Sequence, residues 1–182
     1  MSLRTDPVVT VSVPFQDSPL EPPPPERVRR LRRHLVSSLR DLREARRPDR
    51  LIQPATPEPA GFAADVVRTG CTTCQGFCCK GGGEHAYLDE RTMARVRRDN
   101  PDLDARQVIR LYIEALAPLA YRGSCLFHGA RGCTLPRPLR ADLCNSYYCN
   151  GLRDYLRRGD EPDRVTIMAE RNGQGRQASL VR

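Results

Sequence analysis

The chain has 182 residues and a formal net charge of +8, and hydrophobic residues make up 39% of it. This low hydrophobic share, with sixteen prolines, predicts a compact part of about 100 residues flanked by flexible segments. No apolar run reaches the roughly 18 residues that a membrane-crossing helix needs, and residues 1–13 do not resemble a signal peptide. We therefore expect a cytoplasmic protein without a transmembrane segment.

Residues 1–25 are expected to form a disordered, proline-rich arm. The stretch Val8–Val13 alternates like a strand but has no hairpin partner nearby. The consecutive prolines at 22–25 predict a stiff polyproline II spacer before the first helix.

Residues 26–47 carry the clearest helical pattern in the sequence. The segment contains nine arginines and only three acidic residues, which gives it a net charge of +6. Leucines and a valine recur at steps of three and four and predict one narrow apolar stripe. The stripe consists of Val28, Leu31, Leu35, Leu39 and Leu42. Such a basic amphipathic helix could dock on the rest of the protein or bind an anionic partner, including an unknown protein.

A proline-rich linker is expected at residues 48–61, followed by a cysteine-cluster domain at 62–169 and a disordered tail at 170–182. Within that domain, residues 62–68 are expected to be extended. One helix is predicted from the N-cap Asp89 to Arg98, and a second begins at Asp102 or Asp104. These two helices should supply most of the core.

Residues 123–149 are expected to be irregular, with a short helix at 151–158 and a strand at 165–168. The expected fold class is mainly α with irregular loops, in a small metal-stabilised domain with short strands and a flexible N-terminal arm. A core of this size is one that metals or disulfides commonly stabilise.

The eight cysteines are confined to residues 71–149. They are Cys71, Cys74, Cys78, Cys79, Cys125, Cys133, Cys144 and Cys149. In a cytoplasmic protein disulfides are rare, so clustered thiols indicate metal binding or redox chemistry. The Cys71-x2-Cys74 spacing opens many zinc and iron–sulfur sites. Together with the second set of thiols, it predicts a metal site built by two distant loops.

The spacing of the thiols does not define the metal. Neighbouring side chains in an extended chain diverge, so Cys78 and Cys79 rarely serve the same ion. The downstream set lacks the second CxxC of a zinc ribbon, whereas iron–sulfur clusters tolerate irregular spacing. His85 and His128 could substitute as ligands, although surface or hydrogen-bonding roles are expected for both. The glycines at 81–83 are expected to form a turn that lets the backbone pass close to the site.

The series Cys71-x2-Cys74-x3-Cys78-Cys79, with the downstream thiols and Arg137-Pro138, resembles the CxxCxxxCC cysteine-cluster family (YkgJ-like) over about residues 66–155. Members of that family are described as zinc- or iron-chelating proteins. The resemblance implies that all eight cysteines bind metal. A similar cluster is found in flagellin lysine-N-methylases, where it looks like part of a methyl-transferring enzyme with an iron–sulfur centre. Here Asn145 follows Cys144, where many relatives carry a basic residue.

Three functions follow from these patterns. The first is a metal-chelating protein that binds zinc or iron, including a 4Fe-4S cluster, through thiolates from two loops. The second is an iron–sulfur enzyme related to protein lysine-N-methylases; no independent catalytic constellation supports it, because Asp89-Glu90 fit a helix start. The third is an adaptor that binds an anionic partner through residues 26–47. That segment has no aromatic side chain to stack on bases, so nucleic acid is an unfavoured partner.

Overall fold

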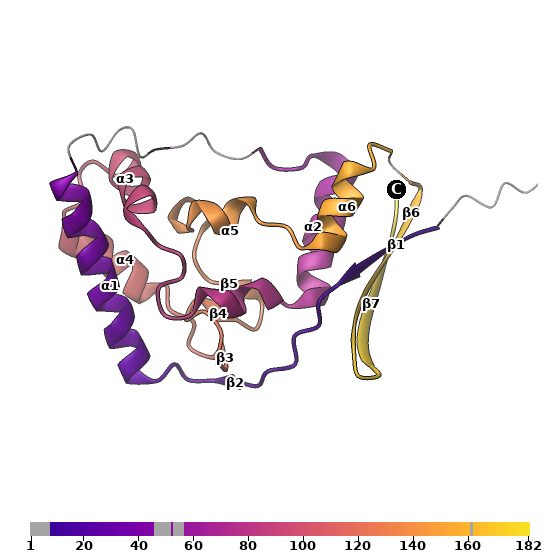
Figure 1. Cartoon of the computed structure of the whole chain (residues 1–182), viewed down its shortest axis with the longest axis horizontal. Helices are drawn as coiled ribbons and strands as arrows, with labels where there is room; N and C mark the ends of the chain where they lie inside the picture. Colours follow the sequence, from indigo (N-terminus) through magenta and orange to yellow (C-terminus); the bar gives the residue numbers. More distant parts are fainter. Residues whose placement is uncertain (1–7, 46–51, 53–56, 161) are drawn as a thin grey trace, which may run out of the picture. The chain divides into compact units, whose positions relative to one another are not determined.

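A computed structural model of the whole chain describes residues 8–45, 52, 57–160 and 162–182 (Figure 1). The chain divides into two compact units. The sheet unit comprises the described parts of Met1–Asp17, Pro57–Phe77 and Tyr148–Arg182. The helical unit comprises the described parts of Ser18–Thr56 and Cys78–Tyr147. The segment expected to be one cysteine-cluster domain, 62–169, therefore contributes to both units.

The sheet unit contains a three-stranded sheet in the order β1-β6-β7. Strand β1 (Val8–Val13) runs parallel to β6 (Arg164–Arg171), and β7 (Gln174–Val181) runs antiparallel to β6. Helices α2 (Gly61–Cys74) and α6 (Asn150–Arg157) pack against it (Figure 1). Alternate residues of β1 and β6 are buried, as a half-buried strand requires, and they form a core with side chains of α2 and α6.

Two segments that were expected to be disordered belong to this sheet. Within the arm predicted at 1–25, residues 8–13 form β1, whose partner β6 lies more than 150 positions later in the chain. Residues 1–7 lie outside the described part. The predicted tail at 170–182 instead completes β6 and forms β7 across a turn at Asn172 and Gly173. Both turn residues have positive φ, which this dipeptide adopts readily in hairpins.

The helical unit is organised around α1 (Pro25–Glu44). The predicted apolar stripe is confirmed, since Leu31 and Leu35 are fully buried. They pack with residues of α3 (Glu90–Asp99) and α4 (Ala105–Glu114) in one hydrophobic core (Figure 1). Residues 46 and 47, the end of the predicted helix, lie outside the described residues, as does most of the predicted linker at 48–61.

The start signals of α3 and α4 are confirmed. The side chain of Asp89 accepts a hydrogen bond from the backbone N–H of Thr92 and caps α3. Asp104, one of the two predicted residues, caps α4, and Gln107 completes a capping box with it.

The remaining elements are short. Strand β2 (Leu20–Glu21) pairs with β3 (Ala120–Tyr121), and β4 (His128–Gly129) pairs with β5 (Gly132–Cys133). Two 3-10 turns, η2 (Phe77–Gly82) and η3 (Arg137–Leu139), and helix α5 (Asp142–Ser146) complete the chain. Residues 123–149 are thus less irregular than expected.

The fold is mixed α/β, which corrects the expectation of a mainly α protein. The sequence patterns missed β7 and the pairing of β1 with β6. Residues 62–68, expected to be extended, belong to α2, which continues to Cys74. Among the described residues, no helix is both long and apolar enough to span a bilayer.

Candidate thiol site

The eight cysteines are divided unequally between the two units. Cys71, Cys74 and Cys149 belong to the sheet unit, and the other five belong to the helical unit. All eight lie within the described residues, and the structure joins none of them in a disulfide. Five thiols thus share the helical unit: Cys78, Cys79, Cys125, Cys133 and Cys144.

The three thiols of the sheet unit lie on helices. Cys71 and Cys74 occupy the last turn of α2, so the CxxC is part of a helix and not of an isolated turn. Cys71 is exposed, whereas Cys74 is buried in the core of the unit, and its sulfur accepts a 3.4 Å hydrogen bond from the backbone N–H of Phe77. Cys149 is the N-cap residue of α6 and packs partly against the same core.

The five thiols of the helical unit come from three separate stretches of chain. Cys78 and Cys79 lie in η2, and the backbone N–H of Cys125 donates to the carbonyl of Cys79 at 3.0 Å. Cys133 lies in β5 opposite His128, and Cys144 lies in α5.

These five sulfurs influence one another electrostatically. Cys78, Cys125 and Cys133 each raise the pKa of Cys79. Cys133 and Cys144 do the same for Cys125, and Cys133 and Cys78 for Cys144. Side chains that are up to 66 positions apart in the sequence therefore gather in one region of the unit.

The adjacent pair Cys78-Cys79 shares a proton unequally. The Cys79 thiol donates a hydrogen bond to the Cys78 sulfur and lowers the pKa of Cys78 to about 7. The same hydrogen bond, with burial and the neighbouring thiols, raises the pKa of Cys79 far above its ordinary value. One sulfur of the pair thus favours the thiolate and the other the thiol.

Loss of water raises the pKa values of two further thiols. Burial raises the pKa of Cys125 to about 12, and a hydrogen bond from the backbone N–H of Phe127 offsets this only in part. Cys144 is exposed as a residue, yet partial desolvation of its sulfur raises its pKa to about 11, and Arg140 lowers this pKa by a smaller amount. These sulfurs are neutral at pH 7 unless a cation compensates for their negative charge.

The glycine run lets the backbone of η2 pass close to the thiols, as predicted. A Cβ atom on Gly82 would lie 3.1 Å from the Cβ and 3.5 Å from the sulfur of Cys125. One on Gly81 would lie 2.1 Å from the hydroxyl of Tyr87. A larger residue at either position would require its neighbours to shift, so η2 lies in close contact with Cys125 and Tyr87.

Tyr87 lies beside the thiols at the end of a strained turn. Ala86 and Tyr87 both have positive φ, which is uncommon for residues other than glycine. Hydrogen bonds from Ala86 N–H to the Gly82 carbonyl (2.7 Å) and from Leu88 N–H to the His85 carbonyl (2.8 Å) hold this turn. Burial and the nearby thiols, with Cys144 first among them, raise the pKa of Tyr87.

The two histidines suggested as substitute ligands have structural roles. The Nδ1 atom of His85 accepts the backbone N–H of Tyr87 at 2.9 Å, and its ring lies edge-on to the Tyr87 ring at 5.4 Å. His128 is fully buried, with Nδ1 2.8 Å from the Ser124 hydroxyl and its ring 4.6 Å from that of Tyr121. Both contacts agree with the hydrogen-bonding roles that the sequence favoured.

Arg95 anchors the loop that leads to Cys144, a role that the sequence analysis missed. It is only 9% exposed although it carries a charge. Its Nε donates to Asp142 at 2.9 Å, and its two terminal nitrogens donate to the carbonyls of Pro138 and Arg140. A single side chain of α3 therefore fixes the start of α5. The residues three and four positions away along the helix are Arg91, Thr92, Arg98 and Asp99, so no sequence pattern marked Arg95 as buried.

Asn145, which replaces a basic residue of the resembled family, closes the same loop. Its side-chain amide donates to the Arg137 carbonyl at 3.2 Å, and Arg137 donates through Nη2 to the Asn145 carbonyl at 3.2 Å. This reciprocal pair joins η3 to α5. The asparagine thus has a local structural role next to Cys144.

The thiols are near one another without forming a ready ligand set. Among the residues that the structure describes, no three Cys, His, Asp or Glu side chains are close enough together to hold one metal ion. The donor chemistry nevertheless fits a soft cation, because thiolates are the preferred ligands of zinc and iron–sulfur centres. Binding would require the five sulfurs to draw closer together.

Comparison with protein-family models gives no match. No curated protein and no solved structure matches the chain either. The resemblance to the CxxCxxxCC family therefore stays a prediction, carried by the cysteine spacing.

Proposed function

We propose that the helical unit binds a thiophilic metal, as zinc or as an iron–sulfur cluster, through the thiols at 78, 79, 125, 133 and 144. The observation that supports this is the gathering of five sulfurs from three separate stretches of one unit, where each affects the ionisation of others.

The ionisation of the thiols favours this function. Cys125 is buried and its pKa is about 12, so without a bound cation it is a neutral thiol at pH 7. A divalent cation stabilises the thiolate and displaces the proton, so affinity should rise with pH. Cys78, with a pKa near 7, offers the first thiolate.

The predicted roles of Cys71, Cys74 and Cys149 in metal binding stay predictions, because these thiols belong to the sheet unit. The iron–sulfur enzyme related to lysine-N-methylases also stays a prediction. Asp89, part of the acidic pair considered in the sequence, acts as a helix cap, and no described group suggests a substrate site.

The proposal is tested by measuring the zinc and iron contents of the intact protein after anaerobic purification. Elemental analysis should give a stoichiometric amount of one metal, and a brown colour with visible absorbance would identify an iron–sulfur cluster. Cys125→Ser and Cys144→Ser should each lose most of the metal. The matched control is Cys71→Ser, an exposed thiol of the sheet unit, which should retain it.

Two results would refute the five-thiol site. One is a protein that contains neither metal when purified without oxygen or chelator and takes up neither on reconstitution. The other is equal loss of metal from Cys71→Ser and Cys125→Ser, which would show that thiols of both units are required.

A further inference from the structure

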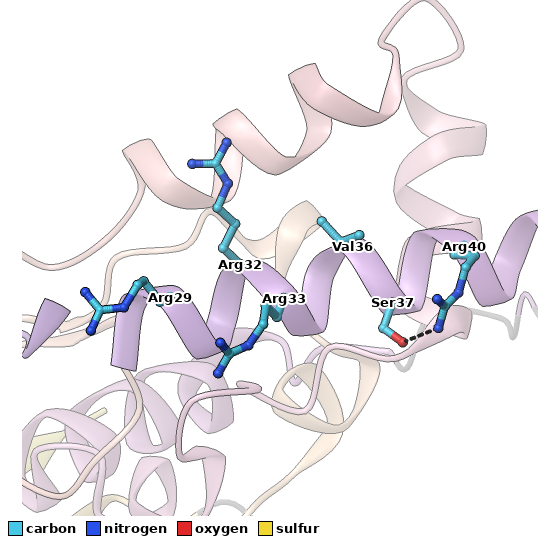
Figure 2. A pocket seen from close by; sticks show the side chains of 6 residues that line it. All are labelled: Arg29, Arg32, Arg33, Val36, Ser37 and Arg40. Carbon is cyan, nitrogen blue, oxygen red and sulfur yellow. Dashed lines mark hydrogen bonds between the residues drawn. The ribbon is translucent and has the colours of Figure 1, made fainter. Parts of the chain in front are cut away.

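The outward face of α1 is an unusually basic surface that the metal proposal does not use. Six residues at steps of three and four line a shallow depression of about 570 Å³ (Figure 2). They are Arg29, Arg32, Arg33, Val36, Ser37 and Arg40. We call this surface the arginine face. From Arg29 to Arg40 it extends about 16 Å, at 1.5 Å per residue.

Most of the charge on this face is not neutralised by the described residues of the unit. Among the described residues, no carboxylate lies within ion-pair distance of Arg29, Arg32 or Arg33, and all three are exposed. Arg40 contacts Asp41 at 3.7 Å and donates to Ser37 at 3.3 Å, both at the surface.

Two other arginines of α1 have structural roles. Arg27 and Arg30 lie on a different side of α1 and both bond to Glu84, at 3.2 and 2.9 Å. Arg27 also donates to the carbonyl of Ser124. These two arginines attach α1 to the loop beside the thiols. The structure describes no hydrogen bond or ion pair from the arginines of the arginine face to another element.

The arginine face is not purely polar. Val36 is 50% exposed and lies between the basic side chains of Arg32 and Arg33 on one side and Arg40 on the other. In Figure 2, Arg32 and Val36 project on one side of the helix and Arg33 and Ser37 on the other. A ligand that follows this face therefore meets positive charge, then an apolar side chain, then positive charge.

This composition disfavours two classes of anion. An interfacial helix inserts its apolar stripe into lipid, but the stripe of α1 is committed to the core, since Leu31 and Leu35 are fully buried. Nucleic acid is disfavoured because α1 has no aromatic side chain on which bases could stack.

We infer that the arginine face binds an acidic segment of a partner protein, in which carboxylates flank an apolar side chain that contacts Val36. Guanidinium groups bind carboxylates in pairs of parallel hydrogen bonds, so Arg29, Arg32 and Arg33 would set the register of the segment. The helical unit is then both a thiol site and a docking module. This inference is independent of whether metal binds.

The test uses the full chain and a fluorescein-labelled synthetic peptide of about 15 residues, long enough for the face. Glutamates flank a single central leucine in the peptide. Fluorescence anisotropy at physiological salt should show saturable binding. Arg29→Glu, Arg32→Glu and Arg33→Glu together should weaken it about ten-fold or more. Val36→Ser should weaken it about three-fold, because it removes the apolar contact.

The matched control changes the net charge equally but elsewhere on the surface. It combines Arg91→Glu, Arg106→Glu and Arg164→Glu, three exposed residues outside the arginine face. This variant should weaken peptide binding by less than about three-fold, through long-range charge alone. The single change Arg33→Glu serves if the triple variant does not give a native circular-dichroism spectrum.

Four results would overturn the inference. They are no binding of the peptide by the native chain, equal effects of the two triple variants, indifference to Val36→Ser, and tighter binding of another anion. For the last, a single-stranded oligonucleotide of similar length and vesicles containing phosphatidylserine are measured in parallel. Preference for either would assign the face to nucleic acid or to a membrane surface instead.

Discussion

Replacing Arg95 with methionine should destabilise the helical unit by about 3 kcal/mol. The side chain is buried and donates three hydrogen bonds, to Asp142 and to the carbonyls of Pro138 and Arg140. Each carbonyl that loses its donor contributes about 1 kcal/mol. The ion pair with Asp142 contributes about 1 kcal/mol, because that carboxylate is still 38% exposed and screened by water. Methionine replaces much of the lost apolar contact.

The assay is thermal unfolding followed by circular dichroism, with reductant and chelator present so that metal does not contribute. For a chain of this length, 3 kcal/mol corresponds to a decrease in Tm of about 6–12 °C. A thiol-reactive reagent should also modify Cys144 faster in the variant, since the loop before α5 loses its anchor.

The matched control is Arg98→Met on the same helix. Arg98 is 54% exposed and its one described ion pair joins it to its neighbour Asp99, so the change should leave the Tm nearly unchanged. Equal Tm values for the two variants would refute the argument that Arg95 fixes the Cys144 loop. Arg95→Lys should recover only part of the stability, because lysine lacks the planar fork.

Two further substitutions test contacts inside each unit. Gly151→Ala should destabilise the sheet unit by several kcal/mol, because its Cβ would lie 1.9 Å from the Ser12 carbonyl oxygen. A urea midpoint of unfolding equal to that of the native chain would contradict this close approach. Glu84→Gln should lose about 1 kcal/mol at pH 7, since the carboxylate binds Arg27 and Arg30. Arg30, with Arg27, lowers the pKa of Glu84, so this difference should be complete above the ordinary glutamate pKa and disappear as pH falls through the lowered value. A difference that stays constant down to acid pH would exclude the ionised pair as its cause.

Local signals in the sequence were sufficient for the three longest helices of the helical unit. The apolar stripe of α1 and the caps Asp89 and Asp104 each depend on residues within one or two turns, and each is confirmed. The hairpin of β6 and β7 also had a local signal, Asn172-Gly173, but the polar alternation of β7 gave little indication of a strand. No residue of β7 is fully buried; alternate residues are half-buried, and the strand is held by its hydrogen bonds to β6 and its contact with α2.

The pairing of β1 with β6 could not be obtained from local patterns. Val9 pairs with Val165, and nothing in either segment specifies a parallel neighbour so distant in the chain. The same holds for Arg95, whose acceptors lie 43 to 47 positions away. Its burial depends on where three backbone segments meet, which residue type and periodicity do not encode.

The structure changes what the cysteine spacing means. CxxC suggested a pair of ligands on one turn. Cys71 and Cys74 do lie three positions apart in the last turn of α2, yet Cys71 is exposed and Cys74 is buried. The vicinal pair suggested diverging sulfurs, yet Cys78 and Cys79 are hydrogen-bonded to each other and have opposite pKa shifts. A 3-10 turn brings adjacent side chains closer than an extended chain does. The spacing of two cysteines is therefore a poor guide to the secondary structure in which they lie. The gathering of remote sulfurs in the helical unit is the stronger argument for a metal.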